Sequence, residues 1–285
     1  MYVLCAPCIL NPSLRANGIT KPSDIQLFDR CIDRCKQFRI TMVPLPCPET
    51  LYLGPERSPG TYLELLNTPE FAMFLEDLCG QVNRIIEERG PPLCILGVNS
   101  SPTCGVTSNY YGSEDGKPSK RPGRGVFLAR FPRFRAQDVA EFAKYRIYLA
   151  APLFSDAERA YNERIAELLK KEYFEVYLPQ DAGDDSPLRG KNEHARIFHR
   201  NRQALHEADI VIAIIDGADA DSGTAWEMGY AAALEKPVIA IRTDFRRVGI
   251  HEQVNLMLEQ SARVVSGEKE LLQALEPYLI GDVCR

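Results

Sequence analysis

The sequence lacks the features that are typical of a membrane protein or of a protein that coats nucleic acid. Its 285 residues contain no apolar run approaching the roughly 20 residues that cross a bilayer as a helix. Basic residues are not in excess, since 34 lysines and arginines stand against 39 aspartates and glutamates, which gives a net charge of -5. Blanket neutralisation of phosphates needs a basic face. We therefore expect a soluble cytoplasmic protein that binds a small molecule, with neither a membrane nor a nucleic acid as its partner.

Familiar cofactor motifs are also missing. The chain has four histidines, with neither His-Glu-x-x-His nor two Cys-x-x-Cys pairs, so zinc is not predicted. The glycines of the second half do not form a dinucleotide-binding fingerprint, so no nicotinamide or flavin is expected. Cysteine, by contrast, is plentiful, and eight of the nine lie before residue 105. In a cytoplasmic protein such thiols are ligands, nucleophiles or core residues rather than disulfides.

Length and patterning predict two α/β domains, residues 1–143 and residues 144–285. The second half alternates apolar strand segments with helices, which is typical of a doubly wound parallel sheet of the flavodoxin or Rossmann type. The first half predicts a smaller, cysteine-rich α/β domain. The expected strands are 2–5, 41–45, 92–98, 146–150, 174–178, 209–215 and 237–242, and the expected helices are 24–38, 61–88, 156–171, 194–207, 224–235 and one from 268. Residues 107–124 are predicted to form a mobile polar loop over the first site.

The densest chemical stretch runs from Asp216 to Tyr230, follows an apolar strand and opens a helix. We expect Glu227 on the first turn of that helix, where the helix N-terminus keeps its carboxylate ionised. An ionised carboxylate can attack an anomeric carbon and complement an oxocarbenium-like transition state. The alternative is that Asp221 only caps the helix and that Glu227 is one of its solvated residues.

A series of motifs runs in order through residues 145–260. They are Tyr148-Leu-Ala-Ala-Pro-Leu-Phe154, Tyr177-Leu-Pro-Gln180, Ala208-Asp-Ile-Val-Ile212, Asp221-Ser-Gly-Thr-Ala-Trp-Glu227-Met-Gly-Tyr230 and Asn255-Leu-Met257. Together they resemble the nucleoside 2-deoxyribosyltransferase family. The resemblance implies that Glu227 is the nucleophile of a glycosyl-enzyme intermediate, that Tyr148 orients it and that Asp221 holds the sugar hydroxyls.

The same resemblance implies a substrate pocket completed by Gln180, Asn201, Gly223, Asn255 and Met257. In that family the residues matching Asn255 and Met257 reach into a neighbouring subunit's pocket, which implies a homo-oligomer. The partner of the site is then a small nucleoside or nucleobase.

Two positions bear on the choice of substrate. Eight residues before Asp209 the family carries a second acid that handles the leaving base, and this sequence has Asn201. An amide can hydrogen-bond a base but cannot protonate it, which favours a better leaving group such as a thiolated base. Related nucleotide hydrolases carry a small hydroxyl residue for a 5′-phosphate where this chain has Asp221. Because a carboxylate repels a phosphate, nucleosides are preferred over nucleotides.

Three cysteines of the first half, Cys8, Cys47 and Cys104, each follow a predicted strand and lie beside proline or glycine. Loops at the ends of parallel strands are where such sheets place ligands, so these thiols can converge on an iron-sulfur cluster that leaves one iron open. One alternative is that they are buried thiols packing as small apolar groups. Another is a zinc or redox pair of Cys5 with Cys8.

The residues around these cysteines are Cys8-Ile-Leu, Arg15-Ala-Asn-Gly18, Pro46-Cys47-Pro-Glu49 and Ser101-Pro-Thr-Cys104-Gly. Over residues 1–135 they resemble the TudS-like family of thiouracil and thiouridine desulfidases. The resemblance implies a 4Fe-4S cluster on Cys8, Cys47 and Cys104, with Glu49 and Ser101 serving proton transfer and substrate orientation. The first motif departs from the family, because a glycine and a second cysteine after the opening apolar pair are absent.

The two resemblances predict a bifunctional enzyme for a thiolated nucleoside. One half breaks or transfers the N-glycosidic bond, and the other removes sulfur from a thiopyrimidine. Two alternatives stay open: a single-activity transferase or hydrolase whose first half is structural or sensing, and a non-catalytic nucleoside-binding sensor. The sequence also leaves other questions open. They are whether the enzyme is a transferase or a hydrolase, whether the sugar is ribose or deoxyribose, which thiolated base is used, whether the two sites act in series, and the oligomeric state.

Overall fold

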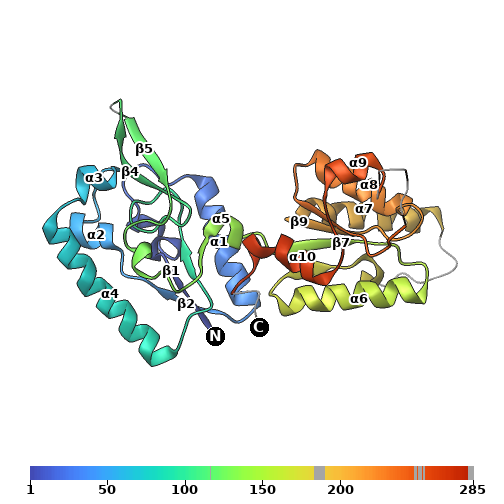
Figure 1. Ribbon diagram of the computed structural model, residues 1–285, viewed down its shortest axis with the longest axis horizontal. Helices are drawn as coiled ribbons and strands as arrows, with labels where there is room; N and C mark the ends of the chain where they lie inside the picture. The colour runs from blue at the N-terminus through green and yellow to red at the C-terminus, as the bar shows by residue number, and fades with distance from the viewer. Residues whose placement is uncertain (116, 183–189, 247–248, 250–251, 253, 282–285) are drawn as a thin grey trace. The chain divides into compact units, whose positions relative to one another are not determined.

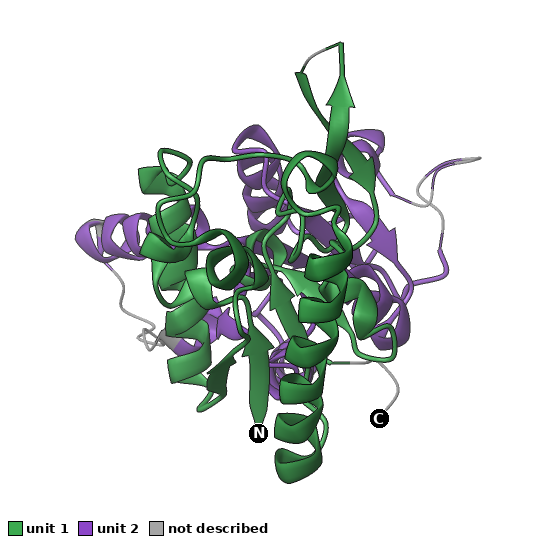
Figure 2. Cartoon of the chain, turned by 90° about the vertical axis from the view of Figure 1, so that its left-hand side faces the viewer, with its two compact units in different colours: residues 1–143, 280–282 green, residues 144–279, 283–285 purple. Residues whose placement is uncertain are grey.

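Figure 1 shows the protein as a computed structural model that describes residues 1–115, 117–182, 190–246, 249, 252 and 254–281. The chain divides into two compact units (Figure 2). Unit 1 comprises Met1–Ala143 and the Ile280–Asp282 segment, and unit 2 comprises Lys144–Leu279. Among the described helices, none has the length and apolarity needed to cross a membrane.

Unit 1 is built on a four-stranded parallel sheet. Its strands are β1 (Tyr2–Cys5), β2 (Thr41–Pro44), β3 (Ile95–Gly97) and β6 (Ala136–Asp138), in the order β2-β1-β3-β6. Its helices are α1 (Pro22–Gln37), α2 (Pro48–Leu53), α3 (Tyr62–Leu65), α4 (Pro69–Arg89) and α5 (Val139–Phe142), with short 3-10 helices η1 (Pro7–Ile9), η2 (Pro12–Leu14) and η3 (Leu128–Arg130). Every residue of β1 is buried, as expected for a central strand that is covered on both faces.

The helix expected over residues 61–88 is two helices, α3 and α4. Thr68 has extended backbone, and its hydroxyl accepts a hydrogen bond from the Phe71 amide at 3.1 Å. Pro69 follows at the first helical position, where its missing N–H costs nothing because that donor has no partner inside the helix. The apolar spacing continues across the break, so periodicity alone joins the two helices.

The segment expected to be a mobile loop contains an antiparallel hairpin of β4 (Ser108–Glu114) and β5 (Lys117–Pro122). The rings of Tyr62 and Tyr111 stack with their centroids 5.4 Å apart, and the guanidinium of Arg121 lies 3.4 Å from the Tyr111 ring centroid. Stacking and cation–π contact stabilise a hairpin whose residues are polar. Composition predicts the polarity of this segment correctly, but the loop prediction is wrong. The strands pair locally, from Ser108 with Pro122 to Glu114 with Lys117, and a polar composition gives no alternating apolar signal for them.

Unit 2 confirms the predicted doubly wound parallel sheet. Its strands are β7 (Arg146–Ala150), β8 (Glu175–Tyr177), β9 (Ile210–Ile214), β10 (Val238–Ile241) and β11 (Arg263–Val265), in the order β11-β10-β9-β7-β8. Its helices are α6 (Asp156–Lys171), α7 (Lys191–Glu207), α8 (Ser222–Ala233), α9 (Leu256–Ser261) and α10 (Glu268–Ala274), with η4 (Pro179–Ala182) and η5 (Glu276–Tyr278). Among the described strands and α-helices of unit 2, β11 and α9 were not foreseen, because each is too short to give a periodic signal.

In both sheets the unit's first strand lies between its second and its third. Counted from β7, the strands of unit 2 have the order 2-1-3-4-5, which is the flavodoxin order. Open α/β sheets bind ligands beyond the carboxyl ends of the strands, at the point where the winding direction reverses. This switch point lies between β1 and β3 in unit 1 and between β7 and β9 in unit 2.

Candidate functional site

In unit 2, a tyrosine and a glutamate meet across the switch point. Tyr148 is the third residue of β7 and is fully buried. Glu227 lies on α8, the helix that follows the neighbouring strand β9. The Tyr148 hydroxyl donates a hydrogen bond to Oε1 of Glu227. Burial and the nearby Glu227 charge both raise the pKa of Tyr148, so the phenol stays protonated and remains the donor.

The position and charge of Glu227 differ from the prediction. Because α8 begins at Ser222, Glu227 lies in the second turn, beyond the range in which a helix N-terminus stabilises a negative charge. Burial raises the pKa of Glu227 to about 7, the hydrogen bond from Tyr148 lowers it, and the charge of Asp221 raises it. The expectation of a first-turn carboxylate kept ionised by the helix is therefore wrong, and Glu227 is not a solvated helix residue either.

Asp221 caps α8. Its Oδ2 accepts hydrogen bonds from the amides of Gly223 at 2.9 Å and Thr224 at 3.1 Å. Both bonds use the same oxygen, so capping and a contact from Oδ1 to a sugar hydroxyl are compatible. Asp221 is also close enough to raise the pKa of Glu227, which puts both carboxylates in one neighbourhood.

A second tyrosine, which belongs to one of the sequence motifs but was given no role there, links Asn201 to this pair. Tyr177 is the residue of β8 that stands in register with Tyr148, and the two rings stack with centroids 5.4 Å apart and planes 19° from parallel. The Tyr177 hydroxyl donates to Oδ1 of Asn201, on α7, at 2.8 Å. Parallel strands pair residue by residue, so the signal for Tyr177 was its register with Tyr148.

The other predicted pocket residues make local contacts. The Gln180 amide bonds α6, accepting from Asn162 Nδ2 at 3.0 Å and donating to the Arg159 carbonyl at 3.2 Å. Asn255 caps α9 by accepting from the Met257 amide at 2.9 Å. Met257 itself is 75% exposed. These hydrogen bonds do not join the three residues to Glu227.

Aromatic residues gather beside Glu227 on α8. Trp226 is the single tryptophan of the chain and is 47% exposed. It stacks on Tyr230 with ring centroids 5.2 Å apart, and the ring of Phe198, from α7, lies 5.7 Å away. The neighbour of the candidate nucleophile in sequence is thus part of an aromatic surface.

In unit 1, the three predicted ligand cysteines follow three adjacent strands. Cys8 lies in η1 after β1, Cys47 caps α2 after β2, and Cys104 lies in the loop after β3. Gly97 makes room for that last loop, because a Cβ at this position would lie 2.3 Å from the Cys104 carbonyl oxygen. The sheet therefore brings all three cysteines to one edge.

These thiols are close enough to influence one another. Burial and, to a smaller extent, the charge of Cys47 together raise the pKa of Cys8 to about 12. Burial likewise raises the pKa of Cys104, with Cys47 and Cys8 adding to the shift. Within the part of the chain that is described, no three histidine, cysteine, aspartate or glutamate side chains lie close enough to hold a single metal ion.

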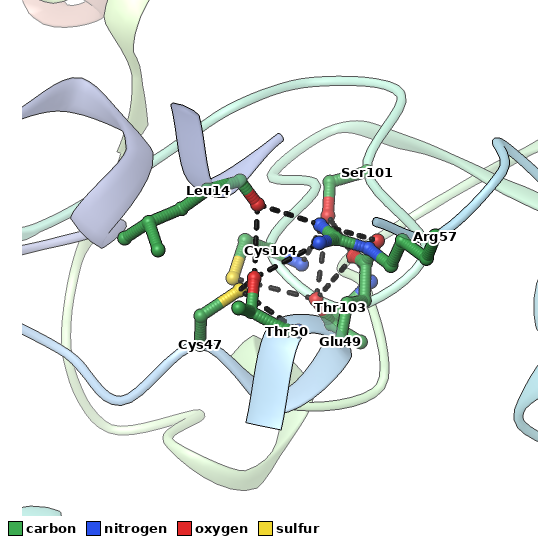
Figure 3. A network of polar contacts seen from close by, with 8 residues as sticks. All are labelled: Leu14, Cys47, Glu49, Thr50, Arg57, Ser101, Thr103 and Cys104. Atoms are coloured by element: carbon green, nitrogen blue, oxygen red, sulfur yellow. Dashed lines mark hydrogen bonds and ion pairs between the residues drawn. The ribbon is translucent and has the colours of Figure 1, made fainter. Parts of the chain in front are cut away.

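A polar network surrounds Cys47 and Cys104 (Figure 3). Oε1 of Glu49 accepts hydrogen bonds from the hydroxyls of Ser101 at 2.9 Å and Thr103 at 2.7 Å. The structure thus brings together both residues predicted for proton transfer and orientation, and adds Thr103. The Thr103 hydroxyl also lies 3.5 Å from the sulfur of Cys104.

Arg57 joins this network from the other side, and sequence reasoning missed it. Its side chain is almost wholly buried, and its Nη2 lies 3.5 Å from Oε2 of Glu49. Nη2 also donates to the Leu14 carbonyl at 2.8 Å, and Nη1 donates to the Thr50 hydroxyl at 2.9 Å. That hydroxyl contacts the Cys47 sulfur at 3.1 Å. One guanidinium therefore ties together segments that follow β1 and β2 (Figure 3).

The family model that matches this chain lies within the second unit. Residues 147–266 match the family model of nucleoside 2-deoxyribosyltransferase. A protein of Ureaplasma parvum is 32% identical over 129 residues, which is 41% of this chain and 80% of that protein. A conserved protein from Enterococcus faecalis of known structure is 30% identical, covering 46% of this chain and 97% of its own, with a TM-score of 0.40. The 2-deoxyribosyltransferase from Leishmania mexicana is 25% identical, covering 47% and 99%, also with a TM-score of 0.40.

Proposed function

Because the C-terminal unit of this chain belongs to the nucleoside 2-deoxyribosyltransferase family, we propose that the protein breaks or transfers the N-glycosidic bond of a nucleoside, with Glu227 as the nucleophile. One observation carries this proposal, the hydrogen bond from the Tyr148 hydroxyl to the Glu227 carboxylate. A partly buried carboxylate with a pKa of about 7, held by a neutral donor at the switch point, has the properties of an active-site nucleophile.

In the proposed reaction, ionised Glu227 attacks the anomeric carbon while the C–N bond to the base breaks, and the bonding electron pair leaves with the base. Water or a second base then opens the glycosyl ester on Glu227, which gives hydrolysis or transfer. Tyr148 holds the carboxylate in place through its hydroxyl. Oδ1 of Asp221 accepts hydrogen bonds from the sugar hydroxyls, and the negative charge of Asp221 disfavours a 5′-phosphate. The substrate is then a nucleoside.

For unit 1 the proposal is desulfuration of a thiolated pyrimidine. Cys8, Cys47 and Cys104 would hold the 4Fe-4S cluster, since they follow three adjacent strands and the charge of Cys47 raises the pKa of both other thiols. Such a cluster supplies, when bound, a Lewis-acidic iron that accepts sulfur. Glu49 moves a proton to or from the substrate, and Ser101, already bonded to Glu49, orients it.

The two activities share a substrate in this proposal. A thiolated pyrimidine is a better leaving group than its oxygen counterpart, which suits a pocket with Asn201 in place of an acid. One unit releases the thiolated base, and the other removes its sulfur. The copies of the chain associate, with Asn255 and the exposed Met257 reaching a neighbouring pocket.

Product analysis tests both activities at once. Protein reconstituted anaerobically with iron and sulfide is incubated with 2-thio-2′-deoxyuridine, and the products are separated by chromatography. Uracil with sulfide supports both sites acting in series, and deoxyuridine with sulfide places desulfuration first. Thiouracil alone leaves only the glycosidic activity. Unchanged substrate contradicts the bifunctional proposal and favours a nucleoside sensor, for which nucleoside binding without turnover is expected in both the wild type and a Glu227→Ala variant.

A further inference from the structure

In the structure, the Tyr177 hydroxyl contacts the oxygen end of the Asn201 amide. The phenolic hydroxyl of Tyr177 donates to Oδ1 of Asn201 at 2.8 Å. An asparagine side chain has one acceptor end and one donor end. With the acceptor end facing Tyr177, the Nδ2 end is directed away from it. Tyr177 stacks on Tyr148, the residue that contacts Glu227, and stands in register with it. The orientation of the Asn201 amide is therefore linked to the position of the candidate nucleophile.

A group that only donates hydrogen bonds makes a different leaving-group site from an acid. The Nδ2 protons of an amide stabilise a developing negative charge, but they are not released to it at ordinary pH. A base that departs beside Nδ2 must therefore carry its electron pair away as an anion. Its charge is then stabilised only by hydrogen bonding to an acceptor atom such as an oxygen or a sulfur.

We propose that Tyr177 is a positioning residue that holds Asn201 as a donor to the leaving base, and that the enzyme thereby selects nucleosides whose base bears an acceptor oxygen or sulfur and leaves as its anion. This inference rests on the proposed glycosidic function of unit 2 and specifies its substrate class. In the step concerned, Glu227 bonds to the anomeric carbon, the C–N bond breaks, and the base anion takes its proton from water after departure.

The class of substrate follows from base acidity. Among pyrimidine 2′-deoxynucleosides, an electron-withdrawing substituent at position 5 makes the base a more stable anion while the two ring carbonyl oxygens stay in place. We expect kcat/KM to fall in the order 5-nitro-2′-deoxyuridine, 5-fluoro-2′-deoxyuridine, 2′-deoxyuridine, thymidine. The spread between the first and the last should reach about a hundredfold, which is the scale of the missing acid catalysis.

Two variants separate positioning from mere support of the fold. Asn201→Asp restores an acid, so the spread across the four nucleosides should narrow, chiefly through faster cleavage of thymidine. Tyr177→Phe removes the hydroxyl but keeps the stacked ring, and kcat/KM for 2′-deoxyuridine should fall about 3- to 10-fold, the scale of one hydrogen bond. In an Asn201→Ala background the same Tyr177→Phe change should have almost no effect, because the amide it positions is gone.

Tyr161→Phe, on α6, is the matched control and should leave all four rates unchanged. A wild-type spread no wider than that of Asn201→Asp would overturn the inference. So would a Tyr177→Phe effect of equal size in both backgrounds, which is what a general structural defect produces. If wild-type protein cleaves neither these four nucleosides nor 2-thio-2′-deoxyuridine, the glycosidic function itself fails, and this outcome is distinct from cleavage that ignores base acidity.

Discussion

Each unit places a glutamate in the segment that follows a strand of its parallel sheet, and the surroundings of the two glutamates differ. Glu49 of unit 1 has two hydroxyl donors on one oxygen and the Arg57 guanidinium 3.5 Å from the other. Glu227 of unit 2 has the hydroxyl of Tyr148 and the like charge of Asp221, and its pKa is raised to about 7. The topology is shared, so the difference arises from the neighbouring side chains.

The difference shows how the same strand order can place a carboxylate in two different electrostatic settings. A carboxylate with hydrogen bonds on one oxygen and a cation near the other is held in place and can organise its neighbours. A carboxylate that is buried beside a like charge is destabilised as an anion, and forming a bond to carbon relieves that cost. Glu49 fits the first description and Glu227 fits the second.

The largest effect is expected from a substitution that removes the reactive carboxylate. Glu227→Gln should lower nucleoside cleavage about a thousandfold or more, because the amide is a poor nucleophile. Binding of the nucleoside, measured by calorimetry, should persist. Glu167→Gln, at an exposed position of α6, is the control and should have wild-type activity. Retained cleavage in Glu227→Gln would show that the two glutamates do not differ in the way described.

The next effect tests unit 1 without touching unit 2. Cys104→Ala should lose most of the iron and acid-labile sulfide that wild-type protein takes up in anaerobic reconstitution, because a cluster ligand is gone. Nucleoside cleavage should be unchanged. Cys79→Ala, which alters a buried thiol of α4 away from the network, should bind iron as the wild type does. Equal iron in both variants would count against the cysteine site.

A smaller effect tests the pairing of Glu49. Arg57→Met should reduce the kcat of desulfuration about 10- to 100-fold, as expected when hydrogen bonds to a charged group are lost. Arg57→Lys should recover part of this loss, because lysine keeps the charge but not the forked geometry. Iron content should stay near the wild-type value in Arg57→Lys. If Arg57→Met and Arg57→Lys are equally impaired, charge is not what Arg57 contributes.

The pH dependence of nucleoside cleavage tests the raised pKa of Glu227. Only the ionised form attacks, so kcat/KM for nucleoside cleavage should rise with pH through about 7 and level off above it. The Tyr148 hydrogen bond lowers the pKa of Glu227, so Tyr148→Phe should move the midpoint to higher pH as well as slow the reaction. A profile that is flat between pH 5 and 9 would contradict the raised pKa.

The smallest effect concerns stability. The pKa of Glu227 in the folded protein is about 7, above the ordinary value of 4.5 that we assign to the unfolded chain. Its contribution to stability is therefore fully present below pH 4.5 and is lost as the pH rises through 7. Glu227→Gln should be more stable than the wild type by about 1–3 kcal/mol at high pH, with little difference in acid. Thermal unfolding at the two pH values measures this.

Sequence reasoning succeeded where a pattern is local or periodic. The strand and helix alternation of unit 2 led to its parallel sheet, and the cysteines were placed after the strands that they do follow. The family of the second unit could be identified from motifs such as Asp221 to Tyr230. The desulfidase resemblance of the first unit and the individual residue roles stay predictions.

What escaped prediction depends on contacts between distant segments. The role of Tyr177 is identified only from its register with Tyr148. Arg57 reaches the carbonyl of Leu14, 43 positions away, and no spacing rule connects them. The charge state of Glu227 depends on burial by the whole unit, which a helix-end rule does not take into account. Local patterns therefore predict which segments carry the residues of both sites, and tertiary packing determines the electrostatics of those residues.

The aromatic surface beside Glu227 also gives the protein an internal optical label. Trp226 is the single tryptophan in 285 residues, is 47% exposed and adjoins Glu227 in the chain. Emission excited at the red edge of indole absorption therefore comes from α8 alone. Quenching or a spectral shift on adding a nucleoside would report events in unit 2, while the cysteine unit would contribute no indole signal of its own. A titration followed in this way can yield the affinity of one unit in the intact protein.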